Sequence, residues 1–179
     1  MNYVSLDEDA GRGGALKSLF EFPNPVNDYA ARCTAALVVA LAVVTIVSRQ
    51  PVATWLAAVM AVGFALRVAG GPRYSPFGRL SVHVLAPRVA REPKLVPGPP
   101  KRFAQTIGLA FSLIAFALFL ADAGLAARIV LGVLILAALA ESALGFCLGC
   151  WMFAQLQKVG IIPESVCIEC ANIWNRPAA

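Results

Sequence analysis

The stretch FAQTIGLAFSLIAFALFLA, Phe103–Ala121, contains no charged side chain. A helix that crosses the hydrocarbon core of a bilayer needs about 20 mainly apolar residues, and this stretch meets that requirement. Three further stretches have a similar length and character, each with one charged residue: Ala30–Ser48, Val52–Ala69 and Ile129–Leu148. None shows the polar face, repeating every 3.6 residues, that helices of a soluble bundle carry. The sequence therefore predicts an all-α membrane protein with four transmembrane helices.

The composition agrees with this fold class. Of the 179 residues, 59% are hydrophobic and 14% are charged, whereas soluble domains are about half apolar and about a quarter charged. Residues 1–28 are mostly polar or acidic and lack the continuous apolar core of a secretory signal. We expect a polar N-terminal segment at 1–28, a four-helix membrane domain at 29–160 and a C-terminal segment at 161–179.

The basic residues predict the orientation. Of the fifteen Lys and Arg residues, only Arg49 and Arg128 fall in the two short turns, after the first and third spans. Because positive residues stay on the cytoplasmic side, both termini and the loop 70–102 should be cytoplasmic, in a multi-pass protein of the inner (plasma) membrane. The basic charge then faces anionic lipid of the bilayer, and no aromatic-and-basic motif predicts a nucleic-acid partner.

The spans are related in pairs. PVNDYAA (Pro25–Ala31) precedes the first span and PPKRFAQ (Pro99–Gln105) precedes the third, while GFALRV (Gly63–Val68) and GFCLGC (Gly145–Cys150) end the second and fourth. The pattern predicts two parallel-repeat hairpins around a pseudo-twofold axis along the membrane normal, as in some transporters. The loop segment 76–91 is either an amphipathic stretch at the lipid surface or a cover for the helix ends. Its histidine, His83, is either solvated or an additional metal ligand.

Four of the five cysteines form two C-x-x-C pairs, Cys147/Cys150 and Cys167/Cys170. We expect the first pair on the last cytoplasmic turns of the fourth span, where the helix dipole disfavours a thiolate. The second pair should lie in the first turns of a short helix that starts at Pro163, where the dipole favours one. We expect Cys33 to be a small buried residue.

Two chemistries fit these pairs. In a thiol-redox or sulfur relay, Cys167 and Cys170 would exchange with a cytosolic partner and pass electrons or sulfur to the membrane pair. The spacing C-x₂-C-x₁₆-C-x₂-C also suits four ligands of a zinc ion or an iron–sulfur cluster, in an accessory subunit of a larger membrane complex. A transporter of a small sulfur species is a third alternative, disfavoured by the few polar residues in the spans. Whether the protein is an enzyme stays open.

Glu141 is the one charged residue of the fourth span. An ionisable residue inside a membrane span is a functional hypothesis by default. On a continuous helix it lies about 120° from Cys147, so it should not share the cysteine face. It either handles protons or forms a hydrogen-bonded carboxyl between helices, near Ser112 or Ser142.

Several motifs occur in a characteristic order: the P-x-x-x-[YF]-A starts, GPRYSPFG (Gly71–Gly78), PPKRFAQTIGLAF and GFCLGC. Together they resemble the DUF4395 family of small bacterial, largely actinobacterial, integral membrane proteins, over about residues 24–159. Members often lie beside or are fused to thioredoxin-like and rhodanese-like proteins, so the resemblance implies thiol traffic or sulfur metabolism with such a partner. The family motif C-L-G-C falls on Cys147 and Cys150, and the second pair lies beyond it.

Overall fold

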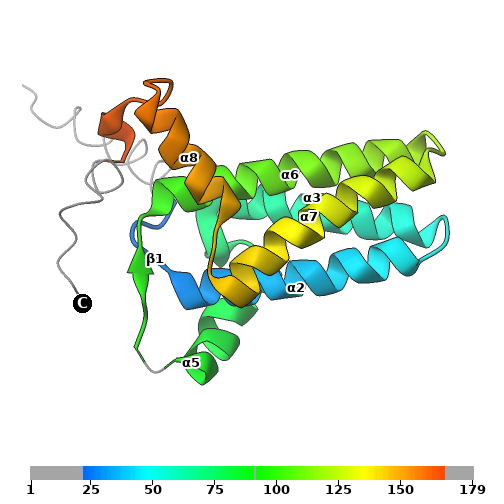
Figure 1. The fold of residues 1–179 in the computed structure, drawn as a ribbon. Coiled ribbons are helices and arrows are strands. Elements are labelled where there is room, and N and C mark those ends of the chain that lie inside the picture. Colours follow the sequence, from blue (N-terminus) through cyan, green and yellow to red (C-terminus); the bar gives the residue numbers. More distant parts are fainter. Residues whose placement is uncertain (1–21, 91, 168–179) are drawn as a thin grey trace, which may run out of the picture.

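Four long helices make up most of the protein (Figure 1). The computed structural model describes residues 22–90 and 92–167. The long helices are α2 (Asp28–Val47), α3 (Val52–Gly70), α6 (Gly98–Leu120) and α7 (Gly124–Leu144). All four are long and apolar enough to cross a membrane, which confirms the predicted all-α membrane fold.

Small residues let the four helices pack closely. The most extensive interfaces join α3 to α6 and α2 to α7. At Gly108 a Cβ atom would stand 2.2 Å from the ring of Phe64, so only glycine allows α6 to approach α3 there. Large apolar side chains such as Trp55 point outward, as expected of surfaces that face lipid. The two predicted hairpins are α2–α3 and α6–α7. A twofold axis that exchanges them would also exchange the α3–α6 interface with the α2–α7 interface, and the internal repeat itself stays a prediction.

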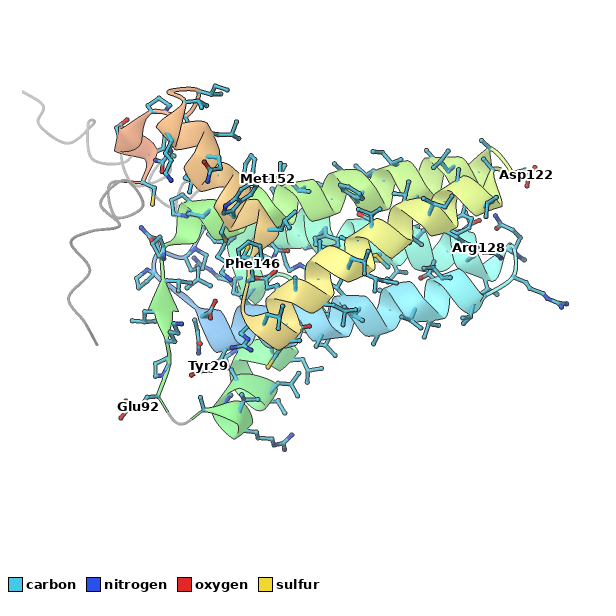
Figure 2. The ribbon with its side chains drawn as sticks, in the orientation of Figure 1. Tyr29, Glu92, Asp122, Arg128, Phe146 and Met152 are labelled. Atoms are coloured by element: carbon cyan, nitrogen blue, oxygen red, sulfur yellow. The ribbon has the colours of Figure 1, made fainter. Side chains whose placement is uncertain are left out.

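The two ends of the bundle differ. Short turns close one end, where Figure 2 shows Asp122 and Arg128. The other end, here called the loop end, carries α8 and a short antiparallel ribbon, in which β1 (Val26–Asn27) pairs with β2 (Leu95–Val96). The ribbon joins the segment before α2 to the segment before α6.

The long loop at this end is largely helical. It contains a 3₁₀ turn (Gly71–Arg73), α4 (Pro76–Leu80), a π-helical stretch (Ser81–Leu85) and α5 (Ala86–Val89). Its buried residues are small, and they allow it to pack on α2: Gly71, Ser75, Gly78, Ser81 and Ala86. The loop thus lies against α2 near the loop end, and His83 is exposed on it.

The fourth span ends four residues earlier than predicted. Helix α7 stops at Leu144, because Gly145 adopts a φ of +70°, a left-handed conformation that favours glycine and ends helices. Arg32 of α2 caps this end, with Nε donating to the carbonyl of Ser142 (3.3 Å) and Nη2 to that of Ala143 (3.0 Å).

A new helix, α8 (Leu148–Lys158), follows the break and runs over the loop end of α6 (Figure 1). The prediction that Cys147 and Cys150 occupy the last turns of the fourth span is therefore wrong.

Candidate dithiol site

Cys147 is the N-cap residue of α8. Its backbone is extended, with φ −85° and ψ 103°, and its Sγ accepts a hydrogen bond from the backbone N–H of Cys150 (3.3 Å). A helix N-terminus stabilises a thiolate, because the unpaired N–H groups and the dipole carry partial positive charge there. From the sequence, this pair was expected at the C-terminal end of the fourth span, where the dipole disfavours a thiolate, because the helix was expected to continue through Gly145.

The two thiols of this pair are not equivalent. The Sγ atoms of Cys147 and Cys150 lie 2.6 Å apart, and the Cys150 thiol donates to Cys147. This hydrogen bond lowers the pKa of Cys147; burial and the charge of Glu141 oppose it, while Lys101 and the Cys150 N–H assist it. The same hydrogen bond, with burial, raises the pKa of Cys150. Cys147 is thus suited to be the nucleophile and Cys150 the resolving thiol.

Gly149, between the two cysteines, sets the position of the pair. A Cβ atom there would stand 2.6 Å from the Cβ and 2.7 Å from the Cα of Ala104 on α6. One turn further on, Phe153 packs edge-on against Phe103, with ring centroids 5.7 Å apart. The first turns of α8 therefore lie directly on α6, close to Lys101.

A buried ion-pair cluster lies beneath the dithiol. Lys101 Nζ is 3.0 Å from Asp28 Oδ1 and 2.8 Å from Glu141 Oε1. The three residues come from α6, α2 and α7, so the cluster joins three of the four spans. Buried charges persist in proteins when they are paired in this way. Asp28 and Lys101 were not predicted as site residues, because both lie near span ends, where charge is expected.

Glu141 and Cys147 line one small cavity inside the bundle, of about 80 Å³, here called the inner cavity. The sequence placed these residues on different helix faces. The break at Gly145 changes the direction of the chain, so that Cys147 and Glu141 line the same cavity. Ser112 and Ser142, the predicted neighbours of Glu141, instead donate to carbonyls of their own helices.

A second cavity reaches Cys147 from outside. This outer cavity, of about 440 Å³, is lined by both thiols and by Lys94, Lys101, Phe146 and Trp151. Phe146 and Trp151 are about half exposed, and Figure 2 shows Phe146 at the start of α8. Cys147 therefore stands between the exterior of the loop end and the inner cavity.

The structure does not bring Cys167 of the second pair to this site. Cys167 is buried, takes part in a disulfide, and follows a 3₁₀ turn at Glu164–Val166. The backbone carbonyl of Cys167 accepts a hydrogen bond from Gln157 Nε2 (3.4 Å). Gln157 is ten residues beyond Cys147 and lies at the opposite end of α8. At 1.5 Å per helical residue, that separation is about 15 Å. Cys170 and most of the predicted C-terminal helix lie outside the described residues.

The remaining candidate ligands are also dispersed. Within residues 22–90 and 92–167, no three His, Cys, Asp or Glu side chains are grouped so that they could hold a metal ion. Cys33 has a free thiol and is half-buried rather than buried as predicted.

The low pKa of Cys147 gives a first testable expectation. Alkylation of Cys147 by iodoacetamide, followed by peptide mass spectrometry across pH, should show a midpoint below the usual thiol value of about 8.5. A Cys150→Ala variant should have a higher midpoint, because the hydrogen bond that lowers the pKa most is lost. Identical midpoints in the two proteins would contradict the assignment of Cys147 as the nucleophile.

The fold and the site together define a multi-pass helical membrane protein with a dithiol at a helix N-terminus. Residues 26–158 match the model of the family described as "Domain of unknown function (DUF4395)", and the chain belongs to this family. The match includes Cys147 and Cys150 and ends before Cys167. Neither a curated protein nor a solved structure matches the chain.

Proposed function

We propose that this protein is a membrane thiol-redox protein whose reactive centre is Cys147 and Cys150. The observation that carries the proposal is the position of Cys147 at the N-cap of α8, where it accepts from both the N–H and the thiol of Cys150. The exchange role that the sequence predicted for Cys167 and Cys170 thus belongs to the pair at the start of α8.

The chemistry is thiol–disulfide exchange. The Cys147 thiolate attacks a disulfide of a partner, forms a mixed disulfide and releases the partner's first thiolate. The Cys150 thiol then loses its proton and attacks Cys147, so that a Cys147–Cys150 disulfide forms and the partner's second thiolate leaves. The partner gains two electrons, and the dithiol loses two. With the opposite driving force, the same steps run in reverse.

The outer cavity supports a protein partner. Its border includes the exposed apolar side chains of Phe146 and Trp151, directly beside the two thiols. Aromatic residues of this kind are enriched at protein interfaces. The distribution of basic residues favours a cytoplasmic position for this face, and the family resemblance implies a thioredoxin-like or rhodanese-like partner there.

The other readings have less support. A four-cysteine zinc site requires all four sulfurs about 3.8 Å apart, because each lies about 2.3 Å from the ion. Cys167 stands at the far end of α8 from the first pair. The metal-site and transporter alternatives thus remain predictions that no described contact favours.

A redox titration tests the proposal. The anaerobically purified protein is equilibrated with mixtures of oxidised and reduced dithiothreitol, and peptide mass spectrometry measures the Cys147–Cys150 disulfide. We expect one reversible two-electron transition at this pair, with no zinc or iron in stoichiometric amount. About one zinc per chain, or iron in cluster proportions, together with thiols that do not oxidise until the metal is removed, would overturn the proposal.

A further inference from the structure

Resolution of the mixed disulfide needs a base that the dithiol itself does not supply. In the dithiol, the Cys150 thiol donates to the Cys147 sulfur, 2.6 Å away. This hydrogen bond and burial raise the pKa of Cys150, and the burial remains after the hydrogen bond is gone. Once Cys147 is bonded to a partner's sulfur, it carries no charge and cannot take up the Cys150 proton. A proton acceptor close to Cys150 would therefore speed the second step, because the thiolate is the nucleophile.

A carboxylate shares the outer cavity with Cys150. Helices α2 and α8 begin at the same end of the bundle (Figure 1), and Asp28, the first residue of α2, lines this cavity of about 440 Å³ together with both thiols. Of the described residues that line it, Asp28 alone carries a carboxylate. A general base must reach the proton directly or through one water, and a polar cavity of this size admits water.

The second carboxylate of the ion-pair cluster faces another space. Glu141 lines the inner cavity, which Cys147 reaches and Cys150 does not. Glu141 also has two cations nearby, since Lys101 Nζ is 2.8 Å from its Oε1 and Arg67 lines the same inner cavity. Two neighbouring cations favour the charged form of a carboxylate. Glu141 is therefore poorly placed to accept the proton of Cys150.

Asp28 can accept a proton without leaving Lys101 unpaired. The ion pair uses Oδ1 of Asp28, and a carboxylate has further acceptor capacity on its second oxygen. When Asp28 is protonated, Lys101 still has Glu141 as its partner. Lys94, the other cation that lines the outer cavity, is exposed, so water and salt screen its charge. We infer that Asp28 is the general base that takes the proton of Cys150 during resolution.

This step rests on the proposed function. As the proton of Cys150 moves to the Asp28 carboxylate, the Cys150 sulfur forms a bond to Cys147 Sγ. The bond between Cys147 and the partner's sulfur breaks, and its electron pair leaves with that sulfur as a thiolate. Asp28 then gives the proton to this thiolate or to water. No further oxidant is consumed, because the partner's disulfide supplies the oxidation.

Two-phase kinetics with an aryl disulfide, dithiobis(nitrobenzoate), test the inference. Attack by Cys147 releases one coloured nitrothiophenolate, and resolution by Cys150 releases the second. A Cys33→Ala background removes the other free thiol of the described residues and serves as the parent protein. Cys150→Ala, which stops after the first release, identifies the first phase. Stopped-flow absorbance then gives the rate of the second phase, which is the rate of resolution.

The pH profile of the second phase reports on the base. In the parent protein the rate should be nearly constant between about pH 5 and 8, where a carboxylate is ionised and a thiol is protonated. In Asp28→Asn it should be about a hundredfold slower at neutral pH and rise about tenfold per pH unit, because Cys150 must ionise unaided. Asp28→Glu, which keeps the carboxylate, should retain the flat profile. An intact first phase shows that each variant is folded.

The sign of the change separates general-base catalysis from an effect of charge. A carboxylate near a thiol disfavours the thiolate, so removal of the charge alone should speed resolution. Glu141→Gln is the matched control, since it removes the other carboxylate that contacts Lys101, and it should resolve no more slowly than the parent protein. Equal slowing in Asp28→Asn and Glu141→Gln overturns the inference. A parent profile that already rises tenfold per pH unit also overturns it.

The two phases also separate this inference from the proposed function. If the second phase of Asp28→Asn proceeds at the parent rate, dithiol exchange stands and only the role of Asp28 is overturned. If the parent protein releases a single nitrothiophenolate, as Cys150→Ala does, Cys150 does not resolve the mixed disulfide, and both the inference and the proposed function are overturned.

Discussion

A Cys150→Ala variant is expected to accumulate a stable mixed disulfide through Cys147. When oxidised glutathione is added, the Cys147 thiolate attacks it, and no second thiol is present at Cys150 to release the glutathione. Intact-protein mass spectrometry should show one glutathione per chain, and peptide mapping should place it on Cys147. Wild-type protein should instead proceed to the Cys147–Cys150 disulfide and retain little glutathione.

The converse variant supplies the control. In a Cys147→Ser variant, the reaction of the protein with oxidised glutathione should be at least about a hundredfold slower. The remaining thiol, Cys150, lacks the helix N-cap position, and its pKa is raised. Cys33→Ala, on α2, should behave as wild type. If a Cys147→Ser variant trapped glutathione on Cys150 as fast as Cys150→Ala traps it on Cys147, Cys150 would be the nucleophile and Cys147 the resolving thiol.

Replacement of Lys101 by methionine should destabilise the protein strongly. The change leaves the carboxylates of Asp28 and Glu141 without their shared cation in a buried site. Breaking a buried ion pair by removing one partner costs about 3–5 kcal/mol. Unfolding of the detergent-solubilised protein by dodecyl sulfate, followed by circular dichroism, measures the loss.

Two further variants make this expectation specific. Lys94→Met removes a positive charge from an exposed position at the same end of the bundle, and should change stability by less than about 0.5 kcal/mol. Adding Asp28→Asn and Glu141→Gln to Lys101→Met removes the unpaired charges and should recover part of the loss. If Lys101→Met proved no less stable than Lys94→Met, the cluster would not hold the three helices together.

The four spans could be predicted from sequence because hydropathy reports directly on the length of apolar helix. The break at Gly145 could not, since the residues on both sides of it are apolar and glycine is common in membrane helices. What makes it a helix end is its left-handed backbone and the cap from Arg32, which is more than 100 residues away in the chain. Because the helix breaks at Gly145, Cys147 lies at the N-terminus of α8, which favours its thiolate, and not at the C-terminal end of the fourth span, which would disfavour it.

The ion-pair cluster was only partly predictable. Glu141 was identified because a carboxylate inside a span requires an explanation. Its partner Lys101 lies at the start of another helix, where a lysine has an ordinary topological explanation, and only the packing of α6 against α7 and α8 shows that it is buried. Tertiary contacts of this kind leave no local pattern in the sequence.

The two residues between the reactive cysteines have different surroundings. Leu148 is 44% exposed beside the thiols, whereas Gly149 is pressed against Ala104 without room for a side chain. Natural selection can thus act on them separately. A substitution at position 148 changes the surface beside the thiols, whereas position 149 tolerates almost no variation, because any larger residue would lift the dithiol away from the bundle. The glycine of the C-L-G-C motif is therefore the residue that this arrangement fixes most tightly.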